Sequence, residues 1–225
     1  MTRWLFERFM HARARTVTER LAPWLPSHGL VLDFGCGTGH NAACLRERTG
    51  LRVREMDVAD LKLVGPPAEQ VDWRGGQGSI PLPDNAIDTS VLLFVLSYAD
   101  HPERVLSELR RVTSGRLLIL QSVCSEPRFR RLLWWREMLE GGLAWDIARI
   151  FRWVRGGREG LCVRQAFDRA ALVELACASG WSLVEQLPES ERAHGRWLSR
   201  DLLVFEPARV ESRLCSTAES NKKVF

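Results

Sequence analysis

The chain has 225 residues, of which 45% are hydrophobic, so it is long enough for one soluble α/β domain with a sizeable core and short for two. A net charge of +4 does not by itself indicate nucleic acid binding, no apolar run approaches the ~20 residues that cross a bilayer, and the first eight residues lack the apolar stretch of a secretory signal. The six cysteines form no C-x-x-C pair, so neither a zinc knuckle nor a redox motif is indicated, and scattered thiols fit a reducing cytoplasm, where we expect this protein.

Residues 4–22 have the periodicity of an amphipathic helix. Apolar side chains recur at steps of three and four residues, and arginines fill the rest of the surface. Pro23 and Pro26 end the pattern, because proline lacks the N–H group that a helix interior needs. We expect a helix that packs on the edge of the core, within an N-terminal helical segment of residues 1–29.

A strand, a glycine-rich loop and a helix are expected between residues 30 and 48. Leu30-Val31-Leu32 is apolar throughout, glycine then stands at positions 35, 37 and 39, and a helical segment follows from about residue 41. Glycine permits positive φ and lets the backbone approach a ligand that a Cβ atom would block. The helix points its free N–H groups at the same place. This arrangement indicates a turn that cradles a nucleotide-like ligand.

The spacing of this loop differs from a dinucleotide fingerprint, which reads G-x-G-x-x-G. Here the loop reads G-x-G-x-G, and Asp33 precedes it by two residues. That acid suits a ligand with an ammonium or sulfonium group. The stretch from Asp33 to Gly39 resembles the first motif of the class I S-adenosylmethionine-dependent methyltransferases, which implies S-adenosylmethionine as the cofactor. A glycine-rich turn in another α/β domain is the alternative. The resemblance also gives helix 4–22 a second interpretation, as a lid over the cofactor.

The second strand is expected at residues 51–57, where side chains alternate, and it ends in Asp57. An acid at the tip of this strand, ~20 residues beyond the glycine loop, is placed to bind ribose hydroxyls. A carboxylate that accepts two hydroxyl hydrogen bonds gives orientation as well as affinity. We therefore expect Asp57 to hold the ribose, with a solvated carboxylate at a strand end as the alternative.

A short strand is expected near residues 71–73, and the following stretch, residues 75–88, carries a second resemblance. It is similar to the G-D-x-x-x-L-P-F-x-D-x-x-F-D segment of small-molecule methyltransferases of the type 11-like branch. Where that family often has an acid for the adenine amino group, this chain has Gly76 or Gln77. The side-chain oxygen of Gln77 can accept the same hydrogen bond without a charge. The matching positions are Ile80, Pro81, Leu82, Asp84, Ile87 and Asp88.

Residues 88–94 and 115–121 have the continuous apolar runs of central parallel strands. A helix from Pro102 to about residue 112 is expected between them, because proline suits the first turn of a helix. No N-P-P-Y tetrapeptide follows the fourth strand, which disfavours amino-group methylation of nucleobases or glutamine.

Residues 95–102 resemble a V-L-H-H-x-x-D-P stretch of the same family. The two histidines of that pattern are Ser97 and Tyr98 here, and its acid is His101. Tyr98 and His101 lie just past the fourth strand and are the candidate catalytic residues. Packing at the start of a helix is the alternative for both.

Residues 124–164 leave the regular alternation and interleave tryptophans with arginines. The pattern suggests two amphipathic helices broken at Gly141-Gly142. An insertion after the fifth strand forms a substrate cap in many similar enzymes, whereas helices that simply cover the sheet are the alternative. A helix from Asp168 to Ser179 and strands at 181–187 and 198–205 are expected to complete the domain.

The resemblance implies an α/β fold with a Rossmann-like, seven-stranded, mostly parallel sheet, helices on both faces, an N-terminal helix and a helical cap insertion after the fifth strand. We expect one methyltransferase domain at residues 1–206, with the cap at 124–164 and a flexible tail at 207–225. The expected cofactor-binding residues are Asp33, Phe34, Gly35, Cys36, Gly37, Gly39, Asp57, Val58, Gln77, Gly78, Leu93 and Phe94.

The expected activity is methyl transfer to a small organic acceptor that is partly aromatic or lipid-like. We expect no metal, no nucleic acid partner and no transmembrane segment. Two alternatives of other classes stay open. One is a non-catalytic regulatory or partner protein with the S-adenosylmethionine fold, and the other is a nicotinamide-dependent oxidoreductase, which the G-x-G-x-G spacing argues against.

Overall fold

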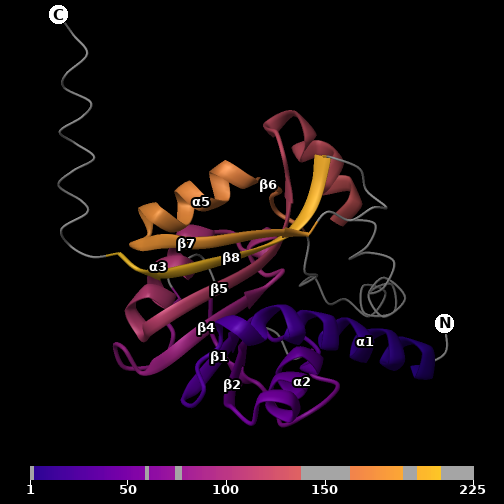
Figure 1. The fold of residues 1–225 in the computed structure, drawn as a ribbon, viewed down its shortest axis with the longest axis vertical. Helices are drawn as coiled ribbons and strands as arrows, with labels where there is room; N and C mark the ends of the chain where they lie inside the picture. Colours follow the sequence, from indigo (N-terminus) through magenta and orange to yellow (C-terminus); the bar gives the residue numbers. More distant parts are fainter. Residues whose placement is uncertain (1–2, 59–60, 74–77, 138–162, 190–196, 209–225) are drawn as a thin grey trace, which may run out of the picture.

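A twisted sheet with helices on both faces forms the core of the protein (Figure 1). The computed structural model describes residues 3–58, 61–73, 78–137, 163–189 and 197–208. The strands are β1 (Leu30–Phe34), β2 (Arg52–Asp57), β3 (Glu69–Gln70), β4 (Ile87–Leu93), β5 (Thr113–Cys124), β6 (Phe167–Asp168), β7 (Trp181–Glu189) and β8 (Leu198–Pro207).

The strand order is β3-β2-β1-β4-β5-β8-β7, with β6 paired to β5 off this path. The pairs from β3 to β5 are parallel, β8 runs antiparallel to β5, and β7 runs antiparallel to β8. The predicted mostly parallel sheet and its final hairpin are therefore confirmed. The prediction of a strand at residues 71–73 is wrong by two residues. The strand is Glu69–Gln70, and Val71 makes the last hydrogen bond to β2 by donating its N–H group to the Asp57 carbonyl (3.0 Å), after which the chain leaves the sheet.

Among the described residues, two helices pack on each face of the sheet, and the burial of alternate strand residues explains why. In β1, Val31 faces one apolar cluster and Leu32 faces the other, as the two-residue period of a strand requires. A fully buried leucine contributes about 2 kcal/mol to folding, and both clusters contain several. None of the described helices is long and apolar enough to cross a membrane. The helices are α1 (Arg3–Leu21) and α2 (His40–Thr49) on the Val31 face, and α3 (Pro102–Val112) and α5 (Arg169–Ala178) on the Leu32 face.

The ends of these helices follow from their sequences. The α2 helix begins after Gly39 and is followed by Gly50, and both glycines have positive φ (82° and 70°). Asp168 caps α5, as predicted, because its side chain accepts a hydrogen bond from the Ala171 N–H group (3.0 Å). Residues 130–137 are also helical, which agrees with the first predicted helix of the cap. Gly141-Gly142 and the second predicted helix lie outside the described residues.

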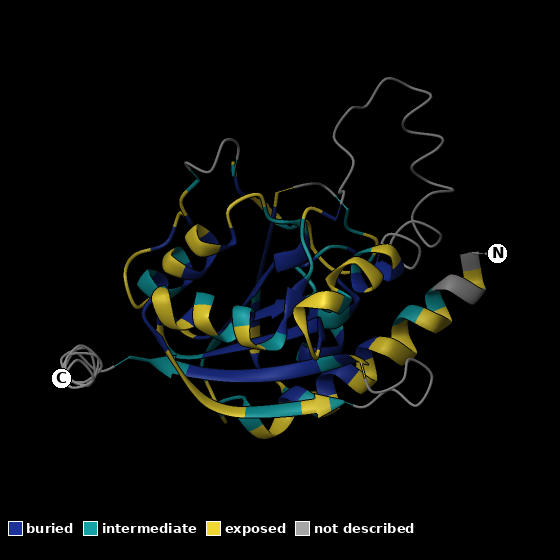
Figure 2. Ribbon diagram, turned by 90° about the horizontal axis from the view of Figure 1, so that it is seen from above, coloured by how far each residue is buried: buried dark blue, intermediate teal, exposed yellow. Residues whose placement is uncertain are grey.

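The two edges of the sheet differ in length. At one edge, β3 has only two residues. At the other edge, β7 has nine residues, with a register shift between Leu183 and Glu185 and with Pro188 near its end. Much of β7 is exposed, whereas the central strands are buried beneath the helices (Figure 2).

Candidate functional site

The glycine loop lies where the carboxyl ends of β1 and β2 meet. The N–H groups of Gly35 and Cys36 donate to the Met56 carbonyl (2.7 and 3.2 Å), which ties the loop to β2. The three loop glycines all have positive φ. A Cβ atom on Gly35 would collide with Val95, but one on Gly37 would meet no atom within 4 Å. The geometry at Gly37 therefore leaves open space beside a backbone that only glycine adopts easily, as a ligand cradle requires.

Asp57 is fixed against this loop. Its Oδ2 atom accepts a hydrogen bond from the Gly37 N–H group (2.7 Å), and its residue is only 5% exposed. The carboxyl group at the tip of β2 therefore stands beside the open space at Gly37. Asp57 and the glycine loop are thus in direct contact, while the contact of Asp57 with ribose stays a prediction.

Asp33 is a fully buried carboxyl group, and neither of its oxygens has a hydrogen-bond partner among the described residues. Burial, followed by the nearby Glu55 and Asp57 carboxylates, raises the pKa of Asp33 to about 7. An unpaired carboxylate in such a place destabilises the fold. A ligand that brings a positive charge would remove that penalty.

Glu55 sits beside Asp33 in the parallel register of β1 and β2 and anchors the crossover that follows. Its carboxylate forms ion pairs with Arg46 and with Lys62, whose side chain is only 7% exposed. The N–H groups of residues 63 and 64 donate to the Thr38 carbonyl (3.1 and 3.2 Å). Residues 61–64 are thereby held against the glycine loop. Sequence reasoning missed this contact, although Lys62 is one of only three lysines in the chain.

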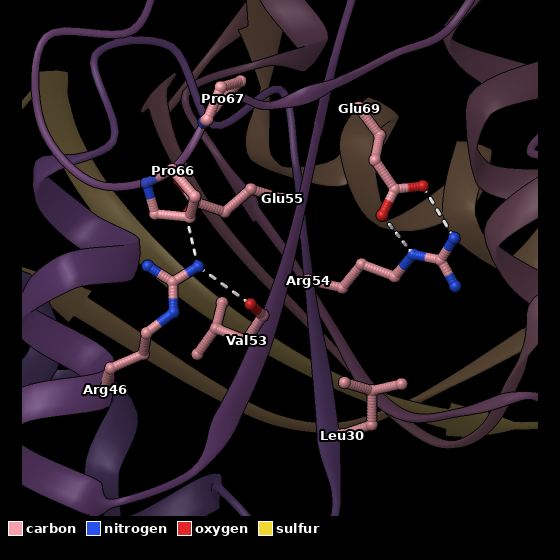
Figure 3. A pocket seen from close by; sticks show the side chains of 8 residues that line it. All are labelled: Leu30, Arg46, Val53, Arg54, Glu55, Pro66, Pro67 and Glu69. Carbon is pink, nitrogen blue, oxygen red and sulfur yellow. Dashed lines mark hydrogen bonds and ion pairs between the residues drawn. The ribbon is translucent and has the colours of Figure 1, made fainter.

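A shallow pocket beside β2 is not the candidate site (Figure 3). Its polar side chains already pair with one another, since Arg54 binds Glu69 through two hydrogen bonds of 2.6 Å and Arg46 binds Glu55. None of its lining residues belongs to the glycine loop, and it includes neither Asp33 nor Asp57.

Phe94 directly follows β4 and has a strained backbone. Its φ is +63°, which is uncommon for a residue with a side chain and costs on the order of 1–3 kcal/mol. Its N–H group donates to the Leu120 carbonyl of β5 (2.8 Å), which holds this conformation. Such strain is concentrated at functional sites. Leu93 and Phe94 therefore place a fixed aromatic ring at the carboxyl end of β4.

Three buried polar residues lie together: Ser97 after β4, Gln121 within β5 and Glu137 after β5. The Gln121 side-chain N–H donates to the Ser97 hydroxyl (2.7 Å) and approaches Glu137 (3.4 Å). The Gln121 Oε1 atom is buried and has no hydrogen-bond partner among the described residues. No motif in the sequence pointed to Gln121 or Glu137, because they are brought together only by the fold.

The two candidate catalytic residues lie in different surroundings. Tyr98 is half-buried in a short 3-10 helix, η3 (Leu96–Tyr98), next to Ser97. His101 is exposed at the start of α3, with its Nδ1 atom 3.2 Å from the Glu103 carboxylate. The surroundings of His101 fit packing at a helix start, and a catalytic role for either residue stays a prediction.

The α1 helix packs against both the sheet and α2. Ala14, Val17 and Leu21 are buried, so the predicted packing on the core is confirmed. One turn before Ala14, the His11 ring meets the His40 ring of α2 edge to face, with centroids 5.1 Å apart. Burial, together with the nearby His11, lowers the pKa of His40. The predicted lid role of this helix stays a prediction.

The remaining predicted cofactor residues are placed as follows. Phe34 is buried with its ring edge to face on Trp73 (5.5 Å), and Cys36 is a buried thiol whose pKa is raised by burial. Val58 is half exposed next to Asp57, and Gly78 lies against Trp73. Gln77 lies outside the described residues.

A family model of the methyltransferase domain matches residues 6–186. The chain belongs to this methyltransferase family. It is a class I S-adenosylmethionine-dependent methyltransferase, and the predicted fold, cofactor and enzyme class are confirmed.

Two curated relatives and one solved structure illustrate the likeness. The chain is 34% identical over 113 residues to malonyl-[acyl-carrier protein] O-methyltransferase of Pectobacterium atrosepticum, covering 48% of this chain and 44% of that one. It is 30% identical over 105 residues to demethylmenaquinone methyltransferase of Tropheryma whipplei, covering 44% and 43%. The matches thus span less than half the length of these relatives.

The solved structure is geranyl diphosphate C-methyltransferase from Streptomyces coelicolor A3(2), in complex with Mg²⁺, geranyl-S-thiolodiphosphate and S-adenosyl-L-homocysteine. It covers 86% of this chain and 76% of its own, with a TM-score of 0.60 and 12% identity. At this identity the likeness shows the fold alone.

The residues of this site fit S-adenosylmethionine. Gly37 opens onto free space, and Asp33 is a buried carboxyl group that lacks a partner among the described residues. A sulfonium or ammonium group near Asp33 would supply the missing positive charge. The Asp57 carboxylate is already oriented by its hydrogen bond from the Gly37 N–H group.

We expect Asp57→Ala to weaken the binding of S-adenosylhomocysteine by about 1.5–3 kcal/mol, because a charge-assisted hydrogen-bonding group is lost. Calorimetric titration of both proteins measures the difference. Asp72→Ala is the control, since Asp72 is an exposed acid outside the loop. Equal affinity of Asp57→Ala and the unaltered protein would show that Asp57 does not hold the ribose.

Proposed function

We propose that this methyltransferase transfers a methyl group to a small organic acceptor that is partly aromatic or lipid-like. The observation that carries this proposal is the set of aromatic side chains beyond the carboxyl ends of β4 and β5. Phe94 follows β4, and the Phe129 ring stacks on Trp197 with centroids 5.2 Å apart. Trp197 accepts a hydrogen bond through its carbonyl from Ser125, directly after β5 (2.9 Å). Aromatic rings of this kind suit a flat apolar ligand.

The names of the relatives support the same class of acceptor. One is named for a malonyl group on an acyl-carrier protein and the other for demethylmenaquinone. Both names describe a small organic group as the acceptor. The absence of an N-P-P-Y tetrapeptide at residues 93–96 also argues against amino-group methylation of nucleobases.

Methyl transfer requires the protein mainly to align the cofactor with the acceptor. S-adenosylmethionine supplies an already activated methyl group, so binding and orientation account for most of the catalysis. We propose that Asp33, Gly37 and Asp57 hold the cofactor, and that Phe94 supports the acceptor next to it. Of the two candidate bases, we retain Tyr98, because His101 is exposed and faces Glu103.

The test is a transfer assay with S-adenosylmethionine that carries a labelled methyl group. The panel contains phenols, quinols, medium-chain and aryl carboxylic acids and a malonyl thioester, with transfer RNA and a protein mixture as comparison acceptors. We expect label in the organic fraction. Label confined to RNA or protein would contradict the proposal. Cofactor binding without label in any acceptor would support the regulatory alternative instead.

A further inference from the structure

Three buried carboxyl groups lie on one face of the sheet, at the carboxyl ends of β1 and β2. Asp33 is paired with Glu55 in the parallel register of the two strands, and Asp57 ends β2 two residues later. Strand residues that are in register, or two apart, share a face of the sheet. Carboxylates held this close raise one another's pKa, so cations must offset their charges if all three are to be ionised.

Two basic side chains of the described residues act on these acids, and both of them pair with Glu55. Arg46, from α2, binds its Oε1 atom, and Lys62, from the crossover after β2, binds its Oε2 atom. Both oxygens of this one carboxylate are therefore engaged by cations.

Asp33 is left without an ion pair among the described residues, and neither of its oxygens has a hydrogen-bond partner there. Asp57, by contrast, accepts from the Gly37 N–H group (2.7 Å). The nearby Cys36 thiol and His40 ring are neutral near pH 7, because burial raises the pKa of the thiol and lowers that of the imidazole. In the described part of the chain, three acids thus meet two cations, and Asp33 carries the excess negative charge when it is ionised.

The backbone around Lys62 fixes its position. The N–H groups of Leu63 and Val64 donate to the Thr38 carbonyl (3.1 and 3.2 Å). Gly39 leaves room for the ammonium group, because a Cβ atom there would collide with the Lys62 Nζ atom. The lysine side chain is largely buried, and a buried ammonium group destabilises the fold unless it is paired. The compact head group of lysine suits this narrow space better than a planar guanidinium.

We propose that Lys62 is a positioning residue for the cofactor, because its pairing with Glu55 allows the neighbouring Asp33 to carry a negative charge. Without the ammonium group, Glu55 would repel Asp33 across the two strands, and Asp33 would keep its proton to higher pH. A protonated Asp33 offers no charge to a sulfonium or ammonium group. This inference rests on the proposed function, in which Asp33 holds the cofactor.

The charges around Asp33 give this role a measurable signature. Burial and the carboxylates of Glu55 and Asp57 raise the pKa of Asp33 to about 7. The cations Lys62 and Arg46 act against this rise. Removal of the Lys62 charge should therefore raise the pH at which Asp33 ionises.

The test is the pH dependence of S-adenosylmethionine binding, measured by calorimetry from pH 5.5 to pH 8.5. For the unaltered protein we expect affinity to rise with pH and to level off above a midpoint of about 7, where Asp33 becomes ionised. Lys62→Met should move this midpoint upward by about one pH unit. Its affinity should then be about tenfold lower at pH 6 and little changed at pH 8.5. Titration of the ligand itself is common to all the proteins and cancels in the comparison.

Two further variants test whether the effect is one of charge. Glu55→Gln removes the repelling carboxylate and should move the midpoint down by about one pH unit. The double variant Lys62→Met/Glu55→Gln should return it close to that of the unaltered protein. If Lys62→Met alone does not fold, the double variant is compared with Glu55→Gln, and its midpoint should be higher by about one pH unit.

Arg54→Met is the matched control. Arg54 also lies on β2 and pairs with an acid, Glu69 (2.6 Å), but it stands next to Glu55 in the strand and so faces the other side of the sheet. Its loss should leave the midpoint unchanged. An unmoved midpoint in Lys62→Met, even with affinity lowered equally at every pH, would leave Lys62 only a role in holding the crossover and would overturn the proposal.

Asp33→Asn separates this result from the proposed function. It should remove the rise of affinity with pH, because no carboxyl group is left to ionise at this position. A rise that persists in Asp33→Asn would contradict the proposed contact of Asp33 with the cofactor, and the role of Lys62 with it. A rise that is lost in Asp33→Asn but keeps its midpoint in Lys62→Met would overturn the role of Lys62 alone.

Discussion

Asp33→Asn is expected to make the protein more stable at alkaline pH while it loses affinity for S-adenosylmethionine. In the folded protein the Asp33 carboxyl group has a pKa of about 7, against an ordinary value of 3.8. At a pH where Asp33 is ionised in both the folded and the unfolded chain, this difference lowers the free energy of unfolding by about 4 kcal/mol. The buried asparagine amide also lacks a partner, which offsets part of the gain. We expect a net stabilisation of about 2 kcal/mol at pH 8.5.

The sign of the pH dependence follows from where the proton is held. Between about pH 4 and pH 7, Asp33 is protonated in the folded protein and ionised in the unfolded chain. The folded state thus binds more protons, so this residue lowers stability as the pH rises through that range. The free energy of unfolding of Asp33→Asn relative to the unaltered protein should increase from pH 4 to pH 7 and then level off.

Denaturant unfolding at several pH values measures this difference, and calorimetry measures cofactor affinity. We expect affinity for S-adenosylmethionine to fall between tenfold and a hundredfold at pH 8.5, because a charge partner of the ligand is lost. Asp100→Asn is the control, since Asp100 is exposed and its ion pair with Arg164 lies on the surface (3.1 Å). A variant that is less stable than the unaltered protein at pH 8.5 would contradict the assignment of Asp33 as a destabilising charge.

Gly37→Ala is expected to abolish cofactor binding and to cost little stability. The new Cβ atom would meet no protein atom within 4 Å, so it would occupy only the space left for the ligand. The positive φ of 52° adds a backbone penalty of about 1 kcal/mol. We expect affinity for S-adenosylhomocysteine to fall at least a hundredfold.

Gly50→Ala is a closely matched control for this substitution. Gly50 also has a positive φ, 70°, and an added Cβ atom would meet no atom within 4 Å there either. It follows the last turn of α2, at the end of the helix opposite the loop. Both variants should lose about 1 kcal/mol of stability, but only Gly37→Ala should lose cofactor binding. Equal affinities in the two variants would mean that the ligand does not contact the loop at Gly37.

The part of the site that follows a local rule could be predicted from sequence. The backbone has positive φ at positions 35, 37 and 39, a conformation that favours glycine. The glycines in the sequence therefore indicate this conformation directly. The acids at 33 and 57 were predictable because Asp33 follows the apolar run at residues 30–32 and Asp57 ends the alternating strand β2. The start of β5 was predicted two residues late, at Gly115, because Thr113 and Ser114 are not part of the apolar run that indicated the strand. The structure keeps that glycine in β5 because a Cβ atom there would collide with the Asp88 carbonyl.

The parts that depend on long-range packing could not be predicted. Phe94 carries no local signal for a positive φ, because its backbone conformation is held by a hydrogen bond to Leu120 of β5. The approach of Arg200 to the Phe94 ring depends on β8 being placed next to β5, which the sequence pattern does not state. Lys62 lies in a crossover without periodicity, and its role is visible only when Glu55 is seen beside Asp33.

The unequal edges of the sheet also affect how copies of this protein meet one another. A long, flat outer strand exposes a row of backbone groups through which a second molecule can extend the sheet and begin aggregation. Here β3 is too short to act as such a template. The register shift in β7 and its Pro188 interrupt the only long outer strand in the described part of the chain. Sheet extension is therefore disfavoured at both edges. The exposed apolar side chains of Leu183 and Val184 on β7 consequently promote aggregation less than they would on an uninterrupted edge strand.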